Sequence, residues 1–199
     1  MKHFSPVLRI FLMLCICLSM LALSPVRTVH AGLITVSSLA DSGAGSLRNA
    51  ISTAVAGDII NFSVTGPILL TTGQLFIPVN LTINGPGVSL LTIDGNANDR
   101  IFDIGPGAVV TITDMTVTNG NVPTDGGDIR NQGTLTLTNL RVLANVATAA
   151  GSRGGGIMNL GTLTVDNSTI HNNTADQYGG GIYSGVGTTL NLTNDVISS

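Results

Sequence analysis

Three charged residues offer the best material for catalysis in this chain of 199 residues. Asp103 and Asp128 lie 25 residues apart, and Arg130 follows the second carboxylate closely. Hydrolysis of a glycosidic bond requires two carboxyl groups a few ångström apart, in distinct roles. The chain contains no Asp-Asp or Asp-x-Asp cluster, however. We therefore interpret the two aspartates as solvated turn residues, predict no catalytic residue, and keep all three residues as the candidates for an enzymatic alternative.

The other polar motifs fall short of a metal or cofactor site. The segment DGNAND, Asp94 to Asp99, has oxygen-bearing side chains at positions 1, 3 and 5, as a calcium loop does. Its sixth position is Asp99 rather than glycine, and its twelfth is Gly105 rather than glutamate. His171 is the one histidine after residue 31, where no cysteine occurs, so a zinc site lacks ligands. We expect no metal and no cofactor, with a weak surface calcium site at Asp94 to Asp99 as the alternative.

Charge and aromatic content narrow the choice of partners. After residue 31 the chain has five arginines and no lysine, against 11 aspartates, which gives a net charge of −6. Binding of nucleic acid requires clustered Lys or Arg to neutralise phosphates, so we expect no nucleic-acid partner. Tyr178 and Tyr183 lie near one turn and could stack on sugar rings, although packing within the turn is the simpler interpretation.

The first 31 residues have the composition of a secretory signal peptide. Lys2 and Arg9 give a basic start, an apolar run of 14 residues follows, and Val29-His30-Ala31 has the form of a cleavage site. We predict cleavage after Ala31, a secreted or cell-surface location, and contact with the membrane only through this peptide. An uncleaved membrane anchor is the alternative, but its apolar run is short for a span of about 20 residues.

One short sequence is repeated three times in the second half of the chain. The copies read GGDIRNQGTLTLTN, GGGIMNLGTLTVDN and GGGIYSGVGTTLNLTN, and their aligned isoleucines Ile129, Ile157 and Ile182 are spaced by 28 and 25 residues. Fixed periods in the twenties predict a solenoid. Within a copy, leucine alternates with threonine, which is the period of a β-strand with one buried face. Three short strands in each coil of about 25 residues indicate a parallel β-helix.

The sequence therefore predicts an all-β fold, a single-stranded parallel β-helix over residues 32–199. Equivalent strands pair one coil apart, so like residues stack on like, and we expect about five to six coils. The usual sense of parallel crossovers makes the helix right-handed. Aligned asparagines Asn139, Asn167 and Asn194 are predicted to form a side-chain ladder in a turn.

The two ends of the solenoid are predicted to differ. A short N-terminal capping helix is expected at about residues 46–56, where Ser46 is the N-cap, an apolar stripe follows with helical spacing, and Gly57 ends the helix. No such device follows the last copy, so we expect an uncapped C-terminal coil, a truncated chain, and self-association through that coil. The residues from Gly179 onward should be the least protected from amide hydrogen exchange.

These segments resemble a known group of proteins. LADSGAGSLRNAIS, GDIINF, LTINGPG and the GGGI copies are similar to bacterial secreted right-handed parallel β-helix proteins whose N-terminal motif reads Cys-Ser-Leu-Arg-Glu-Ala (CSLREA-type). In Gly45 to Ala50, glycine and asparagine replace the Cys and Glu of that motif. The GGxI repeats also resemble those of polymorphic outer-membrane adhesins. The resemblance covers residues 33–199 and implies a pectate-lyase-like fold in a secreted or surface protein.

Two classes of function follow from this. The leading hypothesis is a non-catalytic, adhesin- or scaffold-like protein with polysaccharide or cell-surface glycans as partners. The alternative is a polysaccharide lyase or glycoside hydrolase of the pectate-lyase-like fold, which would use Asp103, Asp128 and Arg130. A lyase of that kind also requires clustered carboxylates for calcium, which the sequence does not supply. Fold alone cannot decide between the classes.

Overall fold

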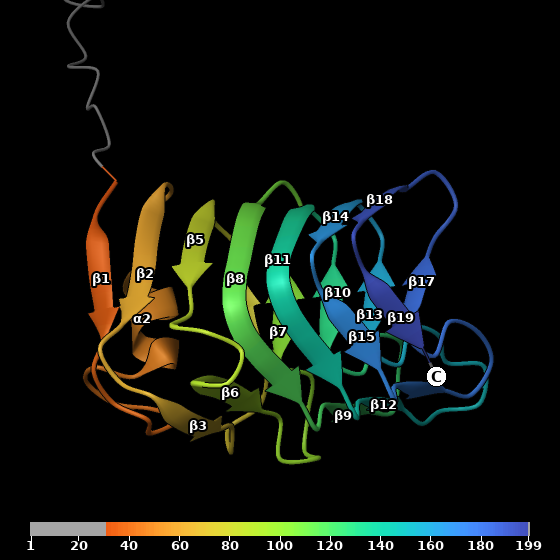
Figure 1. Cartoon of the computed structure of the whole chain (residues 1–199), viewed down its shortest axis with the longest axis horizontal. Coiled ribbons are helices and arrows are strands. Elements are labelled where there is room, and N and C mark those ends of the chain that lie inside the picture. Colours follow the sequence, from red (N-terminus) through yellow and green to blue (C-terminus); the bar gives the residue numbers. More distant parts are fainter. Residues whose placement is uncertain (1–30, 199) are drawn as a thin grey trace, which may run out of the picture.

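The computed structural model describes residues 31–198, and they form a right-handed parallel β-helix of about 6 turns. Figure 1 shows the coils stacked along the long axis of the molecule, from β1 at one end to β17, β18 and β19 at the other. Equivalent strands of successive coils pair in parallel. The predicted fold class is therefore confirmed. The predicted signal peptide concerns residues 1–31, of which 1–30 lie outside the described residues.

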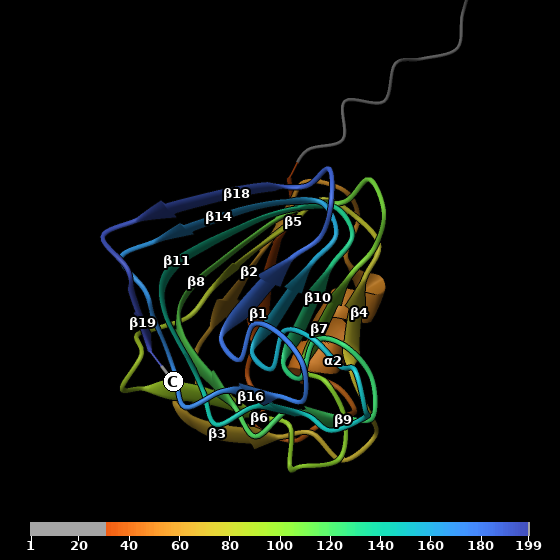
Figure 2. The ribbon, with the colours of Figure 1, turned by 90° about the vertical axis from the view of Figure 1, so that its right-hand side faces the viewer.

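Three parallel sheets form the sides of the coil (Figure 2). The main row of the eleven-stranded sheet runs β1 (Leu33–Val36), β2 (Asp58–Phe62), β5 (Leu81–Asn84), β8 (Val109–Thr118), β11 (Thr134–Leu143), β14 (Thr162–Asp166) and β18 (Thr189–Thr193). Its remaining strands are β3 (Gly66–Leu69), β6 (Leu91–Asp94), β15 (Thr169–His171) and β19 (Val196–Ser198). The five-stranded sheet contains β4 (Leu75–Ile77), β7 (Phe102–Ile104), β10 (Ile129–Asn131), β13 (Ile157–Asn159) and β17 (Ile182–Ser184). The three-stranded sheet contains β9 (Asn121–Val122), β12 (Val146–Ala147) and β16 (Thr174–Ala175).

The core consists of apolar side chains stacked from coil to coil. In β11, Leu135 and Leu137 are fully buried, and they pair in register with Leu163 and Val165 of β14. The threonines between them point to the outer face, as the alternation predicted. Burial of one face of every strand stabilises the stack, because each coil covers the apolar residues of its neighbour.

The aligned asparagines lie where predicted, but they do not form the predicted ladder. Asn139, Asn167 and Asn194 all have positive φ, as does Asp114 one coil earlier, so they occupy the left-handed region that asparagine tolerates in turns. The Asn139 amide donates a hydrogen bond to the Asp114 carboxylate. Among the described residues no hydrogen bond joins the three asparagines themselves. Their shared role is backbone conformation rather than stacking of amides.

Buried amide ladders occur at two other positions of the repeat. Asn131 Nδ2 donates to Asn159 Oδ1 at 2.8 Å, and Asn159 Nδ2 donates to Ser184 Oγ at 2.9 Å, along one edge of the five-stranded sheet. Asn145 Nδ2 donates to Asn173 Oδ1 at 2.9 Å in the next corner. All four asparagines are nearly or fully buried. Buried polar groups require such partners, so these ladders fix the corners of successive coils against one another.

The capping helix is present but shorter than predicted. Helix α2 spans Leu47–Thr53 rather than residues 46–56, with Ser46 as N-cap accepting a hydrogen bond from the amide of Asn49. Three apolar residues of the predicted stripe, Leu47, Ala50 and Ile51, are buried in the core. The helix stops early because the backbone of Ala54 is extended, and the chain then turns into β2. Gly57 has positive φ within that turn and does not end the helix directly.

The last described coil is the most exposed. Every residue of β18 and β19 is exposed, including Leu192 at 45% and Ile197 at 43%. Figure 1 places these strands at the end of the stack opposite α2. Among the described residues, no helix is long and apolar enough to span a membrane.

Candidate functional site

The structure brings two of the three predicted site residues together. Asp103 in β7 and Arg130 in β10 are direct partners in the parallel register of the five-stranded sheet. Arg130 Nε and Nη2 donate to the two carboxylate oxygens of Asp103 at 2.8 and 2.7 Å. Asp103 is 2% exposed, and its hydrogen bonds raise the pKa of Arg130 above the ordinary arginine value. A bidentate pair of this kind holds Arg130 as a cation, which makes it a poor proton acceptor.

Asp128 stands apart from this pair. The interpretation of Asp103 and Asp128 as solvated turn residues was wrong, because both are buried and Asp103 lies within β7. Asp128 aligns with Gly156 of the next coil, is fully buried, and finds no hydrogen-bond partner for either carboxylate oxygen among the described residues. Burial raises its pKa well above the ordinary value, although the charge of Arg100 opposes the shift. Asp103 and Asp128 therefore do not form the two accessible carboxyl groups that glycoside hydrolysis requires.

Arg100, a buried arginine that the sequence analysis did not select, connects to this pair through Gln74 and continues the polar contacts along the solenoid. Arg100 donates from Nη1 to Gln74 Oε1 at 2.9 Å and from Nη2 to the carbonyl oxygen of Asp125 at 2.7 Å. Gln74 in turn donates from Nε2 to Asp103 Oδ2 at 3.1 Å. Burial, followed by the positive charge of Arg130, lowers the pKa of Arg100. Each of these contacts crosses from one coil to the next.

Arg48 continues the same line into the capping helix. Its Nη1 and Nη2 donate to the carbonyl oxygens of Gln74 and Gly73 at 2.8 and 2.6 Å. Its Nε and Nη2 also donate to Asp41 Oδ1 at 3.0 and 2.7 Å. The arginine of the SLRNA motif thus joins α2 to the chain that leads into β4, which gives the motif a structural role.

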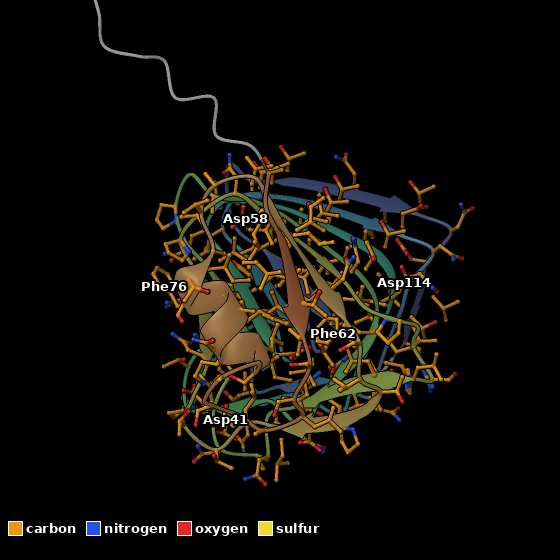
Figure 3. All side chains as sticks on the ribbon, turned by 90° about the vertical axis from the view of Figure 1, so that its left-hand side faces the viewer. Asp41, Asp58, Phe62, Phe76 and Asp114 are labelled. Carbon is orange, nitrogen blue, oxygen red and sulfur yellow. The ribbon has the colours of Figure 1, made fainter. Side chains whose placement is uncertain are left out.

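Asp41 is the anchor of that contact. Its second oxygen, Oδ2, accepts hydrogen bonds from the backbone and side chain of both Thr71 and Thr72, at 2.7 to 3.1 Å. Burial by itself raises the pKa of Asp41, but the hydrogen bonds from Thr72, Arg48 and Thr71 outweigh it and lower the pKa to about 2. Figure 3 shows Asp41 near the foot of α2, at the N-terminal end of the solenoid.

At the other end of the line, an arginine contacts both predicted aromatics. Arg153 pairs with Asp125 at 3.0 Å, and its guanidinium carbon lies 4.8 Å from the centre of the Tyr183 ring. Its Nη1 donates to the Tyr183 hydroxyl at 3.2 Å. Tyr178 forms a backbone bridge with Arg153 and is 59% exposed. The hydrogen bonds to Asp125 and then to Tyr183 raise the pKa of Arg153.

Together these residues form a continuous polar line on the side of the five-stranded sheet, which we call the arginine row. It comprises Asp41, Arg48, Gln74, Arg100, Asp103, Asp125, Arg130, Arg153 and Tyr183. Sequence reasoning found Asp103, Arg130 and Tyr183 in it and missed the others. The available signal was that four of the five arginines after residue 31 recur at intervals close to one or two coils.

The remaining candidates do not converge on a site. In the DGNAND turn, Asp94 Oδ1 accepts a hydrogen bond from the backbone N–H of Asn96, and Asp99 Oδ2 accepts one from the backbone N–H of Gln74. His171 lies at the end of β15 and pairs in register with Leu143. Over residues 31–198 no three metal-ligating side chains gather in a way that could hold an ion.

No protein-family model matches this chain, and no curated protein matches it. These comparisons lend no support to the CSLREA-type or adhesin assignments in particular. What the structure supports is the coarser statement that this is a β-helix repeat protein.

Proposed function

We propose that this is a secreted or cell-surface, non-catalytic scaffold of the adhesin type, and that it binds polysaccharide or cell-surface glycans along the arginine row. The observation that carries the proposal is the placement of Arg153 against the ring of Tyr183, with Tyr178 exposed beside it. Planar guanidinium groups and exposed tyrosine rings are suited to bind the hydroxyl groups and apolar faces of sugars.

The neighbouring Arg130 extends this surface by one coil. Its side chain is 36% exposed, and that of Arg153 is 38% exposed. Arg130 uses Nε and Nη2 for Asp103, which leaves Nη1 without a partner among the described residues. The pairing with Asp103 fixes the side chain in place, so little entropy is lost when a ligand binds.

Binding to a panel of acidic and neutral polysaccharides, measured by affinity electrophoresis, tests the proposal. Tyr178→Ala and Arg153→Gln should each reduce retardation by the bound polysaccharide about tenfold. Arg141→Gln is the matched control, because Arg141 lies in β11 of the eleven-stranded sheet, away from the row. Retardation that is equal in all variants would contradict binding at the row.

The same samples separate a binding protein from an enzyme. Release of reducing or unsaturated ends from any polysaccharide, lost in Asp103→Ala or Asp128→Ala, would establish the lyase or hydrolase alternative. Retardation without turnover would support the scaffold. The buried ion pair of Asp103 and the inaccessible Asp128 are the reasons we favour the second outcome.

A further inference from the structure

Asp58 is a buried carboxylate that lacks a countercharge in the described residues. It lies at the start of β2 and is 5% exposed. Its Oδ1 accepts a hydrogen bond from the backbone nitrogen of Gly32 at 2.7 Å, and its Oδ2 accepts one from Val55 at 2.9 Å. Each of three other aspartates forms an ion pair with an arginine: Asp41, Asp103 and Asp125. A buried carboxylate held only by neutral donors retains much of its desolvation cost.

The nitrogen that faces Asp58 belongs to the residue after the predicted cleavage site. A side chain at position 32 would place its Cβ 2.9 Å from Asp58 Oδ1, so glycine allows the close approach of the two groups. The carbonyl oxygen of Gly32 accepts from Ile59 at 2.8 Å, which holds the residue at the edge of β2. Ala31, the residue before it, is exposed. Figure 3 shows Asp58 close to the point where the chain enters β1.

We propose that the Ala31–Gly32 bond is a processing site and that Asp58 is the built-in receptor for the new N-terminus. The inference rests on the export step of the proposed function and not on glycan binding. A signal peptidase hydrolyses the bond with one water molecule, leaving a carboxylate on Ala31 and an α-ammonium on Gly32. The hydrogen bond at 2.7 Å then joins an ammonium to a carboxylate and becomes an ion pair.

Processing therefore changes the stability of the solenoid and not only its location. Before cleavage, the Asp58 charge is buried against two amide groups. After cleavage, the ammonium neutralises it and supplies further donors to the same oxygen. Because the pair closes the start of β1 onto β2, the first coil should become harder to open once the leader is removed.

The chain beginning at Gly32 and the full chain beginning at Met1 should be compared by thermal unfolding, each with Asp58 intact and as Asp58→Asn. We expect the processed form to melt about 5 °C or more above the full chain. In the Asp58→Asn variant, this difference in melting temperature should almost disappear. Asp166→Asn, a substitution of a half-buried aspartate without an ion-pair partner in the described residues, is the control and should leave the difference intact.

Titration of the Gly32 amine by NMR measures its pKa, which would not change if Asp58 had only a structural role. Its pKa should lie above the ordinary α-amino value of about 7.7–8.0 in the processed protein and return to it in Asp58→Asn. Since the folded pKa is raised, the added stability should be present below pH 8 and disappear as pH rises through the raised value. An unshifted amine, equal melting of the two forms, or an exported chain that begins elsewhere than Gly32 would overturn the proposal. Loss of glycan binding alone would not.

Discussion

Asp128 occupies a position at which the next two coils carry glycine, Gly156 and Gly181. A glycine there lets the stacked backbones approach closely, whereas Asp128 places a carboxyl group inside the coil without a hydrogen-bond partner. Burial raises its pKa, so the folded state binds this proton more tightly than the unfolded state does. At the scale of single residues, this position therefore costs stability at neutral pH.

Replacement of this residue by the glycine of the later coils should be stabilising. Asp128→Gly should raise the free energy of unfolding by about 2 kcal/mol at pH 8, since it removes an unpaired buried carboxyl group. The stability of the wild type should fall as pH rises from about 4 towards the raised pKa, while the variant should lack this slope. Urea unfolding at pH 4, 6 and 8 measures both effects. Parallel pH profiles for the two proteins would contradict the assignment.

Asp41 should behave in the opposite way. Its pKa is lowered to about 2 by hydrogen bonds that exceed the effect of burial, so its charge stabilises the fold above the unfolded pKa. We expect Asp41→Asn to reduce the free energy of unfolding by about 2 kcal/mol at pH 7. The gap between variant and wild type should close as pH falls from 4 to about 2. Chemical unfolding over this range, with the half-buried Asp166→Asn as the control, checks the prediction.

At the scale of elements, the sequence correctly predicted the features of the repeated strands, but it did not predict the end of the single helix. The spacing of Ile129, Ile157 and Ile182 predicted the register that the five-stranded sheet shows. Alternation of leucine and threonine correctly predicted the buried face of β11. Both signals are local or periodic, so they can be read along the chain. The end of α2 comes instead at the extended backbone of Ala54, after which the backbone N–H of Val55 donates to Asp58, and no period reveals either feature.

The candidate site was harder to predict for the same reason. The sequence placed Asp103 one coil from Asp128 with Arg130 nearby, whereas the register of the aligned strands sets Asp103 opposite Arg130. Arg48 and Arg100 contact their partners from a helix and from a turn, where the number of residues per coil varies. Burial of Asp128 could not be inferred from its type, since charged residues are almost never fully buried.

The amide ladders make the coils depend on one another in a measurable way. Asn159 is fully buried and makes four hydrogen bonds through its side chain, two of them to Asn131 Nδ2 and Ser184 Oγ. Asn159→Ala should lower the free energy of unfolding by about 3 kcal/mol, because it leaves several buried groups unpaired. Asn191→Ala is the matched control, since this exposed residue makes one bond of 3.4 Å, and it should cost less than about 0.5 kcal/mol. An equal decrease in the free energy of unfolding in both variants would show that the ladder does not stabilise the fold more than an exposed asparagine does.

At the scale of the whole molecule, the two ends of the stack differ in burial. Leu47, Ala50 and Ile51 of α2 lie in the core at one end, whereas Leu192 and Ile197 are substantially exposed at the other. The outer edges of β18 and β19 have no strand beside them in the described residues. In a solenoid each coil is stabilised by its neighbours, so the coil with one neighbour opens most readily.

Hydrogen exchange of the 199-residue chain should show this gradient. We expect amides after Gly179 to exchange fastest and those of β8 and β11 slowest. The same chain should associate with rising concentration through the exposed apolar residues of its last coil, as sedimentation would measure. Leu192→Lys should suppress association, while Val109→Lys, an exposed change on β8, should not. Strong protection of β18 in a strictly monomeric sample would contradict both expectations.

The clamp formed by Asp41, Arg48 and the chain at Thr71 and Thr72 has a consequence for folding in time. Its hydrogen bonds join residues of the N-terminal part of the domain that are about one coil apart in the sequence. A parallel strand then needs only the preceding coil as its template. Residues that leave a ribosome or a membrane pore first are thus the ones that can form a nucleus without the rest. We therefore expect the order of synthesis to be the order of assembly, and, if the chain is exported as proposed, each folded coil would oppose its backward movement.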